Sequence, residues 1–137
     1  MDLTYKPAIL PNRFRFVAVF FPAPGISPEE FHNYWLHEHG RLFMSLDIVK
    51  KNLTKYEQLH FNHDAVRSLT AASSSAPEAN SYWGMAIFEA ESFDKLTEVF
   101  SHPDYQRVVF PDEQVILDKS RTLLFAGQFA TILNQSF

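Results

Sequence analysis

Residues 14–21, which read FRFVAVFF, constrain the fold more than any other part of the chain. Aromatic and β-branched residues favour a strand, and Pro22, Pro24 and Gly25 mark its end. Successive side chains of a strand point to opposite faces of a sheet, and in this run both faces are apolar. A sheet that contains such a strand must therefore be covered on both sides.

A helix is predicted to follow this first strand. Ser27 can cap the helix, Pro28 suits its first turn, and Glu30 can return its carboxylate to the backbone of the cap. The helix is expected to run from Pro28 to about His39, where Gly40 allows a break.

The rest of the chain repeats the order of strand, helix and strand. Further strands are expected over residues 54–62, 82–90 and 122–133, and helical segments from residue 93 and over residues 104–117. Residues 64–81 are rich in Ser and Ala and are predicted to form a loop or mobile lid. Two βαβ units with a long connection predict an α+β fold of the ferredoxin-like split βαβ type, with a four-stranded antiparallel sheet.

The composition indicates one domain with apolar surface to spare. A chain of 137 residues is long enough for one core, so residues 1–137 are taken as a single domain. Hydrophobic residues make up 46% and aromatic residues 15%, which is more than one core of this size needs. We therefore expect a homodimer, in which a second copy covers the free face of the sheet to form a dimeric α+β barrel. The alternative is that loops of the same chain cover this face.

Several classes of function lack their usual signals. The net charge is −4 with no run of Lys or Arg, so nucleic-acid binding is not expected. No apolar run approaches the roughly 20 residues of a membrane span. The chain has no cysteine and no recognisable secretory signal, so a cytoplasmic location is expected. Phosphate-binding glycine loops, dinucleotide fingerprints and nucleophile elbows are absent from the sequence, and no cofactor is predicted.

His39 is the first candidate for chemistry. On a helical wheel it shares a side with Trp35, so its imidazole is expected to be buried. His37 points the other way, so the run His37-Glu38-His39 lacks the four-residue spacing of a two-histidine metal site, and no metal is predicted. A buried imidazole either transfers protons or is a core residue bonded to a backbone carbonyl, and both interpretations are open.

The predicted second strand carries an unusual polar face. Alternation in KYEQLHF, residues 55–61, places Tyr56, Gln58 and His60 together. Burying them without partners would cost on the order of a few kcal/mol, so we hypothesise that they line a pocket for a polar ligand. The alternative is an edge strand whose polar face meets water. His39 and His60 lie on consecutive elements, and both are expected to line one pocket.

Three aromatic residues and a further histidine complete the set of candidates. Phe16, Trp35 and Trp83 are predicted to form apolar walls that hold a flat ring, although each also suits a core. His102 lies in a sequence typical of a helix break and is included as a candidate substrate contact.

The segments that hold these residues resemble one family. SPEEFHNYWLHEHG and KYEQLHF are similar to motifs of the EthD-like dimeric α+β barrels, and SHPDYQRVVFPDEQVILD resembles the small fungal members found in anthraquinone and xanthone polyketide clusters. The resemblance covers roughly residues 14–133. The family's helix-end histidine corresponds to His39 and its strand-two histidine to His60.

The resemblance also implies an activity. Such relatives remove carbon dioxide or water from a tricyclic aromatic polyketide acid without a metal or nucleotide. The expected function is therefore a lyase, a decarboxylase or dehydratase, that acts on an aromatic polyketide carboxylic acid in fungal secondary metabolism by histidine acid–base catalysis. The alternatives are a cofactor-free oxygenase or cyclase on the same fold and a non-catalytic carrier of an aromatic metabolite.

Overall fold

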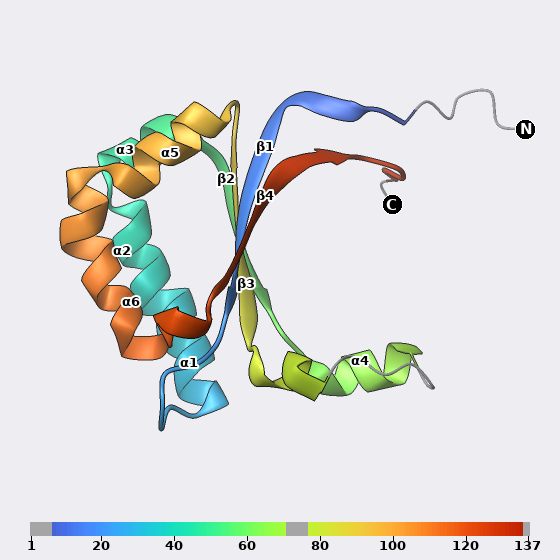
Figure 1. Ribbon diagram of the computed structural model, residues 1–137, viewed down its shortest axis with the longest axis vertical. Helices are drawn as coiled ribbons and strands as arrows, with labels where there is room; N and C mark the ends of the chain where they lie inside the picture. The colour runs from blue at the N-terminus through green and yellow to red at the C-terminus, as the bar shows by residue number, and fades with distance from the viewer. Residues whose placement is uncertain (1–6, 71–76, 136–137) are drawn as a thin grey trace, which may run out of the picture.

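The computed structural model describes residues 7–70 and 77–135 and is built on a four-stranded sheet (Figure 1). The strands are β1 (Ile9–Phe20), β2 (Leu53–His60), β3 (Gly84–Ala90) and β4 (Leu123–Ala130). Their order across the sheet is β2-β3-β1-β4, and every neighbouring pair is antiparallel. The predicted ferredoxin-like α+β fold is thus confirmed, with β2 and β4 as the edges of the sheet.

The helices of both βαβ units cover one face of this sheet (Figure 1). The first unit contributes α1 (Pro28–Tyr34), α2 (Gly40–Met44) and α3 (Asp47–Asn52), and the second contributes α5 (Phe93–Ser101) and α6 (Phe110–Ile116). The predicted capping box starts α1: the Ser27 hydroxyl accepts from the Glu30 amide, and the Glu30 carboxylate accepts from the Ser27 amide. Within residues 7–70 and 77–135, no helix is long and apolar enough to cross a membrane.

Each helical region contains a π-helical turn, in which the backbone hydrogen bond spans one residue more than in an α-helix. The turns are η1 (Trp35–His39), between α1 and α2, and η3 (Tyr105–Val109), directly before α6. The predicted break at Gly40 is wrong, because Gly40 has ordinary helical dihedral angles, φ −59° and ψ −41°, and the helical path continues to Met44. The extra residue in η1 changes the direction of the side chains that follow it.

The core lies between the helical layer and the sheet. Ala18 and Phe20 of β1 belong to the same buried cluster as Phe31, Trp35 and Phe43 of the first helical region. The rings of Phe20 and Trp35 meet edge to face, with 5.4 Å between their centroids and 79° between their planes, which aromatic quadrupoles favour. The helices therefore hide one of the two apolar faces that the sequence predicts.

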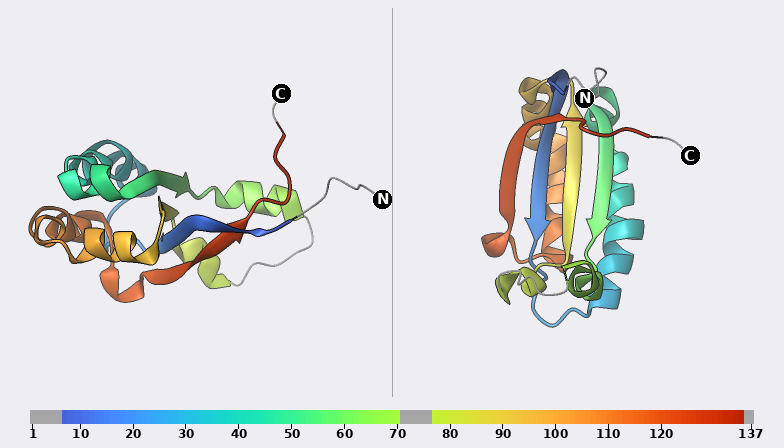
Figure 2. Two further views of the ribbon diagram at one scale, coloured as in Figure 1. Left: turned by 90° about the horizontal axis from the view of Figure 1, so that it is seen from above. Right: turned by 90° about the vertical axis from the view of Figure 1, so that its right-hand side faces the viewer.

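Among the residues that the structure describes, no helical layer lies over the opposite face of the sheet (Figure 2). Alternation along the paired strands places Val17 and Val19 of β1, Leu59 of β2 and Phe125 of β4 on this side. Leu59 is 52% exposed and Phe125 is 58% exposed, which is high for apolar side chains within a sheet. Half of the apolar sheet is therefore uncovered in the single chain.

The segment predicted to be a loop, residues 64–81, is partly helical, so that prediction is wrong. It contains α4 (His63–Thr70) and a 3₁₀ turn, η2 (Pro77–Ser81), while residues 71–76 lie outside the described part of the chain. The Asn62 side chain accepts from the Ala65 amide and caps α4, a local bond that the Ser and Ala content of the segment does not reveal. α4 projects from one end of the sheet, on the side away from the other helices (Figure 1).

Trp35 fixes the first helical region to the sheet at Gly84. The indole is completely buried, and a Cβ atom on Gly84 would lie 2.8 Å from its Cη2 atom and closer still to its Cζ3 atom. Only a residue without a side chain allows the indole to lie this close to the β3 backbone.

Gly84→Ala is expected to destabilise the protein by roughly 1–3 kcal/mol, because the added methyl group must displace the indole or the strand. Gly127→Ala in β4 is the control, since a Cβ atom there meets no atom of the same chain within 4 Å. Denaturant unfolding measures both free energies. Equal free energies of unfolding for the two variants would contradict the close packing of Trp35 on Gly84.

Candidate active site

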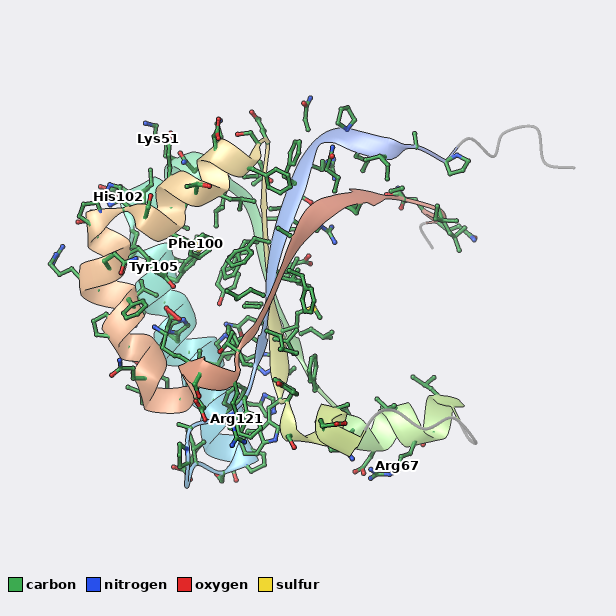
Figure 3. The ribbon with its side chains drawn as sticks, viewed as in Figure 1. Lys51, Arg67, Phe100, His102, Tyr105 and Arg121 are labelled. Carbon is green, nitrogen blue, oxygen red and sulfur yellow. The ribbon has the colours of Figure 1, made fainter. Side chains whose placement is uncertain are left out.

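His39 lines a cavity between the sheet and the second helical region. The cavity has a volume of about 310 Å³. Most of its lining is apolar and includes Phe16, Phe20, Phe43, Phe88, Phe100, Val109 and Leu124. Phe100 and Tyr105 point from the helical layer toward the sheet (Figure 3). A space of this size and lining suits a small aromatic molecule.

The His39 imidazole is held by Asp112, which Tyr34 holds in turn. Its Nδ1 atom lies 2.9 Å from Oδ2 of Asp112 in α6, and the Tyr34 hydroxyl of α1 donates to Oδ1 of the same carboxylate at 2.5 Å. The hydrogen bond to Asp112 raises the pKa of Tyr34 to about 12, so Tyr34 stays a donor at neutral pH. Since the Asp112 carboxylate only accepts, Nδ1 of His39 carries a proton, and Nε2 is the nitrogen left to act on a ligand.

Charged groups form another part of the cavity wall. The Tyr105 hydroxyl donates to Oε1 of Glu113, and Nζ of Lys119 lies 3.7 Å from Oε2 of the same carboxylate. Lys119 also lies over the ring of Phe110, 2.9 Å from its centroid. Burial raises the pKa of Tyr105, and burial lowers the pKa of Lys119 although Glu113 opposes that shift. The cavity thus combines an aromatic wall with a few polar groups, as ligand sites commonly do.

His60 lies in a different place, and the prediction that His39 and His60 share one pocket is wrong. His60 lines an open hollow of about 510 Å³ on the polar face of β2, together with Tyr56 and Gln58. β2 is an edge strand covered by the first helical region, whereas His39 points from that region toward Asp112 of α6. The same helical path therefore separates the two histidines.

A continuous hydrogen-bonded chain crosses this hollow. Nε2 of Gln58 donates to the Tyr56 hydroxyl at 2.9 Å and to the Trp35 carbonyl at 3.0 Å. Oε1 of Gln58 lies 2.9 Å from Nε2 of His60, and Nδ1 of His60 lies 2.7 Å from Nδ1 of His32. Because the amide nitrogen of Gln58 donates twice, its oxygen accepts from Nε2 of His60. One proton is then shared between the two Nδ1 atoms.

The structure brings together Tyr56, Gln58 and His60, as alternation predicts. β2 is an edge strand, as the alternative interpretation expected. Its polar face does not simply meet water, however, because the first helical region lies beside it and forms the other wall of the hollow. Phe16 lines the other cavity, beside His39. Within residues 7–70 and 77–135, no three His, Asp or Glu side chains converge as metal ligands would.

The remaining candidates occupy structural positions. Trp35 is fully buried, and its ring stacks at a tilt on that of His60, 4.6 Å between centroids. Trp83 packs edge to face on Phe31 and lines neither the cavity nor the hollow. His102 accepts from the Asp104 amide at its Nδ1 atom and points outward from the helical layer (Figure 3). A role of Trp83 or His102 in binding substrate stays a prediction without a contact to support it.

Two partners of the histidines were not predicted. His32 had a detectable signal, because His32, Leu36, Gly40 and Met44 follow at intervals of four residues and all line the hollow. Asp112 had none, since it reaches His39 from an element 73 residues further along the chain. Its sequence context, after Pro111, indicated only the start of a helix.

Comparison with known proteins identifies the family. The model of the EthD domain matches residues 23–120, which is most of the chain. The chain belongs to the EthD domain family. Both the His39 cavity and the His60 hollow draw most of their polar residues from this EthD domain. A comparison with curated proteins finds no significant sequence match.

Solved structures with the same fold are distant in sequence from this EthD domain. Hydroxynitrile lyase from Passiflora edulis superposes with a TM-score of 0.60 at 10% identity, over 93% of this chain and 99% of that one. An EthD family protein from Bacillus halodurans superposes with a TM-score of 0.57 at 10% identity, over 84% of this chain and 96% of that one. A dimeric ferredoxin-like protein of unknown function from Bacteroides fragilis superposes with a TM-score of 0.59 at 10% identity, over 89% of this chain and 100% of that one. At these identities the likeness extends to the fold alone.

The histidine pair in the EthD domain predicts a pH dependence of stability. Burial lowers the pKa of His32 below its ordinary value of 6.5, and burial together with the charge of His32 lowers the pKa of His60. The unfolded chain then binds protons more readily than the folded chain below about pH 6.5. The stability that the pair contributes is therefore complete above about pH 6.5 and is lost as the pH falls through the lower folded-state pKa values.

Denaturant unfolding of the wild type and of His32→Asn between about pH 7.5 and about pH 5 measures this loss. The wild type is expected to lose more of its free energy of unfolding over this interval, because the variant lacks one of the two depressed groups. Identical pH dependence in both proteins would contradict the assignment.

Proposed function

We propose that this EthD-domain protein is a lyase that removes carbon dioxide or water from an aromatic polyketide carboxylic acid, with His39 as the group that transfers the proton. One observation carries the proposal: the His39–Asp112 pair lies at the wall of a cavity lined by phenylalanines. The carboxylate orients the imidazole so that Nε2 is left to act on a ligand, and the aromatic wall suits a flat ring system. Hydroxynitrile lyase from Passiflora edulis has the same fold, so the fold is compatible with lyase chemistry, although the likeness itself extends to the fold alone.

Decarboxylation of a β-keto acid would use His39 as a general acid. Nε2 of the protonated imidazole gives its proton to the keto oxygen while the bond between the α-carbon and the carboxylate breaks. The electron pair of that bond forms the enol double bond, and carbon dioxide leaves. The neutral imidazole regains a proton from water, and the enol becomes the ketone by exchange with solvent. Asp112 and Tyr34 keep the ring oriented throughout.

Dehydration of a β-hydroxy acid would use the same proton donor. Protonated His39 gives its proton to the leaving hydroxyl, which departs as water, and a proton from the neighbouring carbon is lost to a base to form the double bond. Glu113 lies in the same cavity and is the carboxylate available for that role. No cofactor is needed for either reaction, and a cytoplasmic location fits the cysteine-free sequence.

His39→Gln is expected to lower turnover by roughly 10²–10⁴-fold, because Gln retains hydrogen bonding but does not titrate near neutral pH. Mass spectrometry of candidate polyketide acids incubated with the wild type and the variant measures this loss. The exposed His37 provides the matched control, and His37→Gln should keep full activity.

His60→Gln separates the two sites in the same assay. If the reaction takes place in the His39 cavity, His39→Gln loses turnover and His60→Gln keeps most of it. The reverse result, a loss in His60→Gln with an active His39→Gln, would place the reaction in the β2 hollow. Oxygen uptake would contradict the lyase assignment and indicate an oxygenase. Ring closure without loss of mass would indicate a cyclase, and binding without turnover would indicate a carrier.

We also infer that the protein is a homodimer that buries the uncovered face of its sheet. Leu59, Leu123 and Phe125 on this face are each more than 40% exposed in the single chain. Monomeric proteins rarely leave such a contiguous apolar patch in water. The Bacteroides fragilis protein with the same fold is described as dimeric.

Sedimentation at micromolar concentration is expected to give about twice the chain mass of 15.8 kDa. Phe125→Arg should shift the protein toward the monomer, because a charge then faces the partner sheet. Val115→Arg is the control, since Val115 is similarly exposed, at 52%, but lies on α6 on the opposite side of the sheet. A wild type that sediments as a monomer would contradict the inferred interface.

A further inference from the structure

We propose that Gln58 is a positioning residue for His39. Gln58 acts from outside the cavity, because it holds the π-helical turn η1 through the carbonyl of Trp35. This inference rests on the proposed function in one respect, the transfer of the proton by His39. Gln58 lines the β2 hollow and not the His39 cavity. Any influence of Gln58 on a ligand in that cavity must therefore pass through the protein.

The Trp35 carbonyl receives two hydrogen bonds. The Gly40 amide donates to it and closes the π turn, and Nε2 of Gln58 donates to it from β2 at 3.0 Å. In an ordinary α-helix the Trp35 carbonyl would instead accept from the amide of His39. The bond from Gln58 ties the first residue of the turn to the sheet, so it stabilises the arrangement in which Gly40 and not His39 closes the turn.

Gly40 lies directly beside this bond. A Cβ atom on Gly40 would lie 3.4 Å from both Nε2 of Gln58 and the Trp35 carbonyl oxygen, which is the near limit of ordinary van der Waals contact. The backbone of η1 therefore packs against the Gln58 amide.

The direction of His39 depends on the turn. His39 is the last residue of η1, and its Nδ1 atom meets Asp112 at 2.9 Å. A return to α-helical pairing would move the His39 side chain around the helix axis, while Asp112 is held by α6 and by Tyr34. The His39–Asp112 bond is thus made in the π-helical arrangement that Gln58 supports.

Gln58 is itself held in one orientation. Its Oε1 atom accepts from Nε2 of His60, and its Nε2 atom also donates to the Tyr56 hydroxyl. A flipped amide would place Oε1 against the Trp35 carbonyl oxygen, which has no proton to give. The polar residues of β2 therefore act as a fixed support behind η1.

Gln58→Met tests the proposal, because it keeps the length of the side chain and removes the donor. The expected result is a kcat lower by roughly 10–100-fold with KM changed by less than about 2-fold, as for a misdirected catalytic group. The downfield proton NMR resonance of Nδ1–H of His39, identified by its loss in Asp112→Asn, should move or broaden. Gln128→Met is the control, since Gln128 bonds the Leu10 carbonyl in another part of the sheet.

Gln58→Glu is the second variant, in which a carboxylate of similar shape repels the Trp35 carbonyl, and it should give the same changes if Gln58→Met does not fold. An unchanged resonance overturns the proposal. A raised KM with unchanged kcat would also overturn it and assign Gln58 to direct substrate binding. The resonance requires no substrate, so it decides the role of Gln58 even if no polyketide acid is turned over and the proposed function fails.

Discussion

The packing of the Trp35 indole on Gly84 determines where the first helical region lies on the sheet. No side chain separates the indole from the β3 backbone, and Phe20, Phe31 and His60 contact the ring from other sides. With the helix fixed at this point, one side of it faces β2 and the other faces α6. The β2 hollow and the His39 cavity exist as separate spaces because this anchor lies between them.

The two histidines have different partners. His39 faces the Asp112 carboxylate, which fixes the orientation of its imidazole and leaves Nε2 free to meet a ligand. His60 faces a second imidazole, and burial disfavours a charge on either ring of that pair. His39 therefore keeps a ring nitrogen free beside the cavity, whereas both ring nitrogens of His60 are bonded to protein groups, which argues for a chemical role of His39 and a supporting role of His60.

The sequence predicts most of what depends on local pattern. Alternation and helical spacing correctly predict the strands, the capping box at Ser27 and the burial of His39, and they leave His37 exposed. They miss contacts between distant elements, such as the pair of His39 and Asp112. They also miss the π turn η1, because a helical wheel assumes one constant rotation per residue and β2 supplies the stabilising bond from outside the helix.

The location of a bound aromatic acid tests the central claim most directly. A crystal structure of the protein with a polyketide carboxylic acid would show which space the ligand occupies. We predict that its rings lie among the phenylalanines of the cavity and that its reacting oxygen lies within hydrogen-bonding distance of Nε2 of His39. A ligand found in the β2 hollow against His32 and His60, with the His39 cavity empty, would contradict the account.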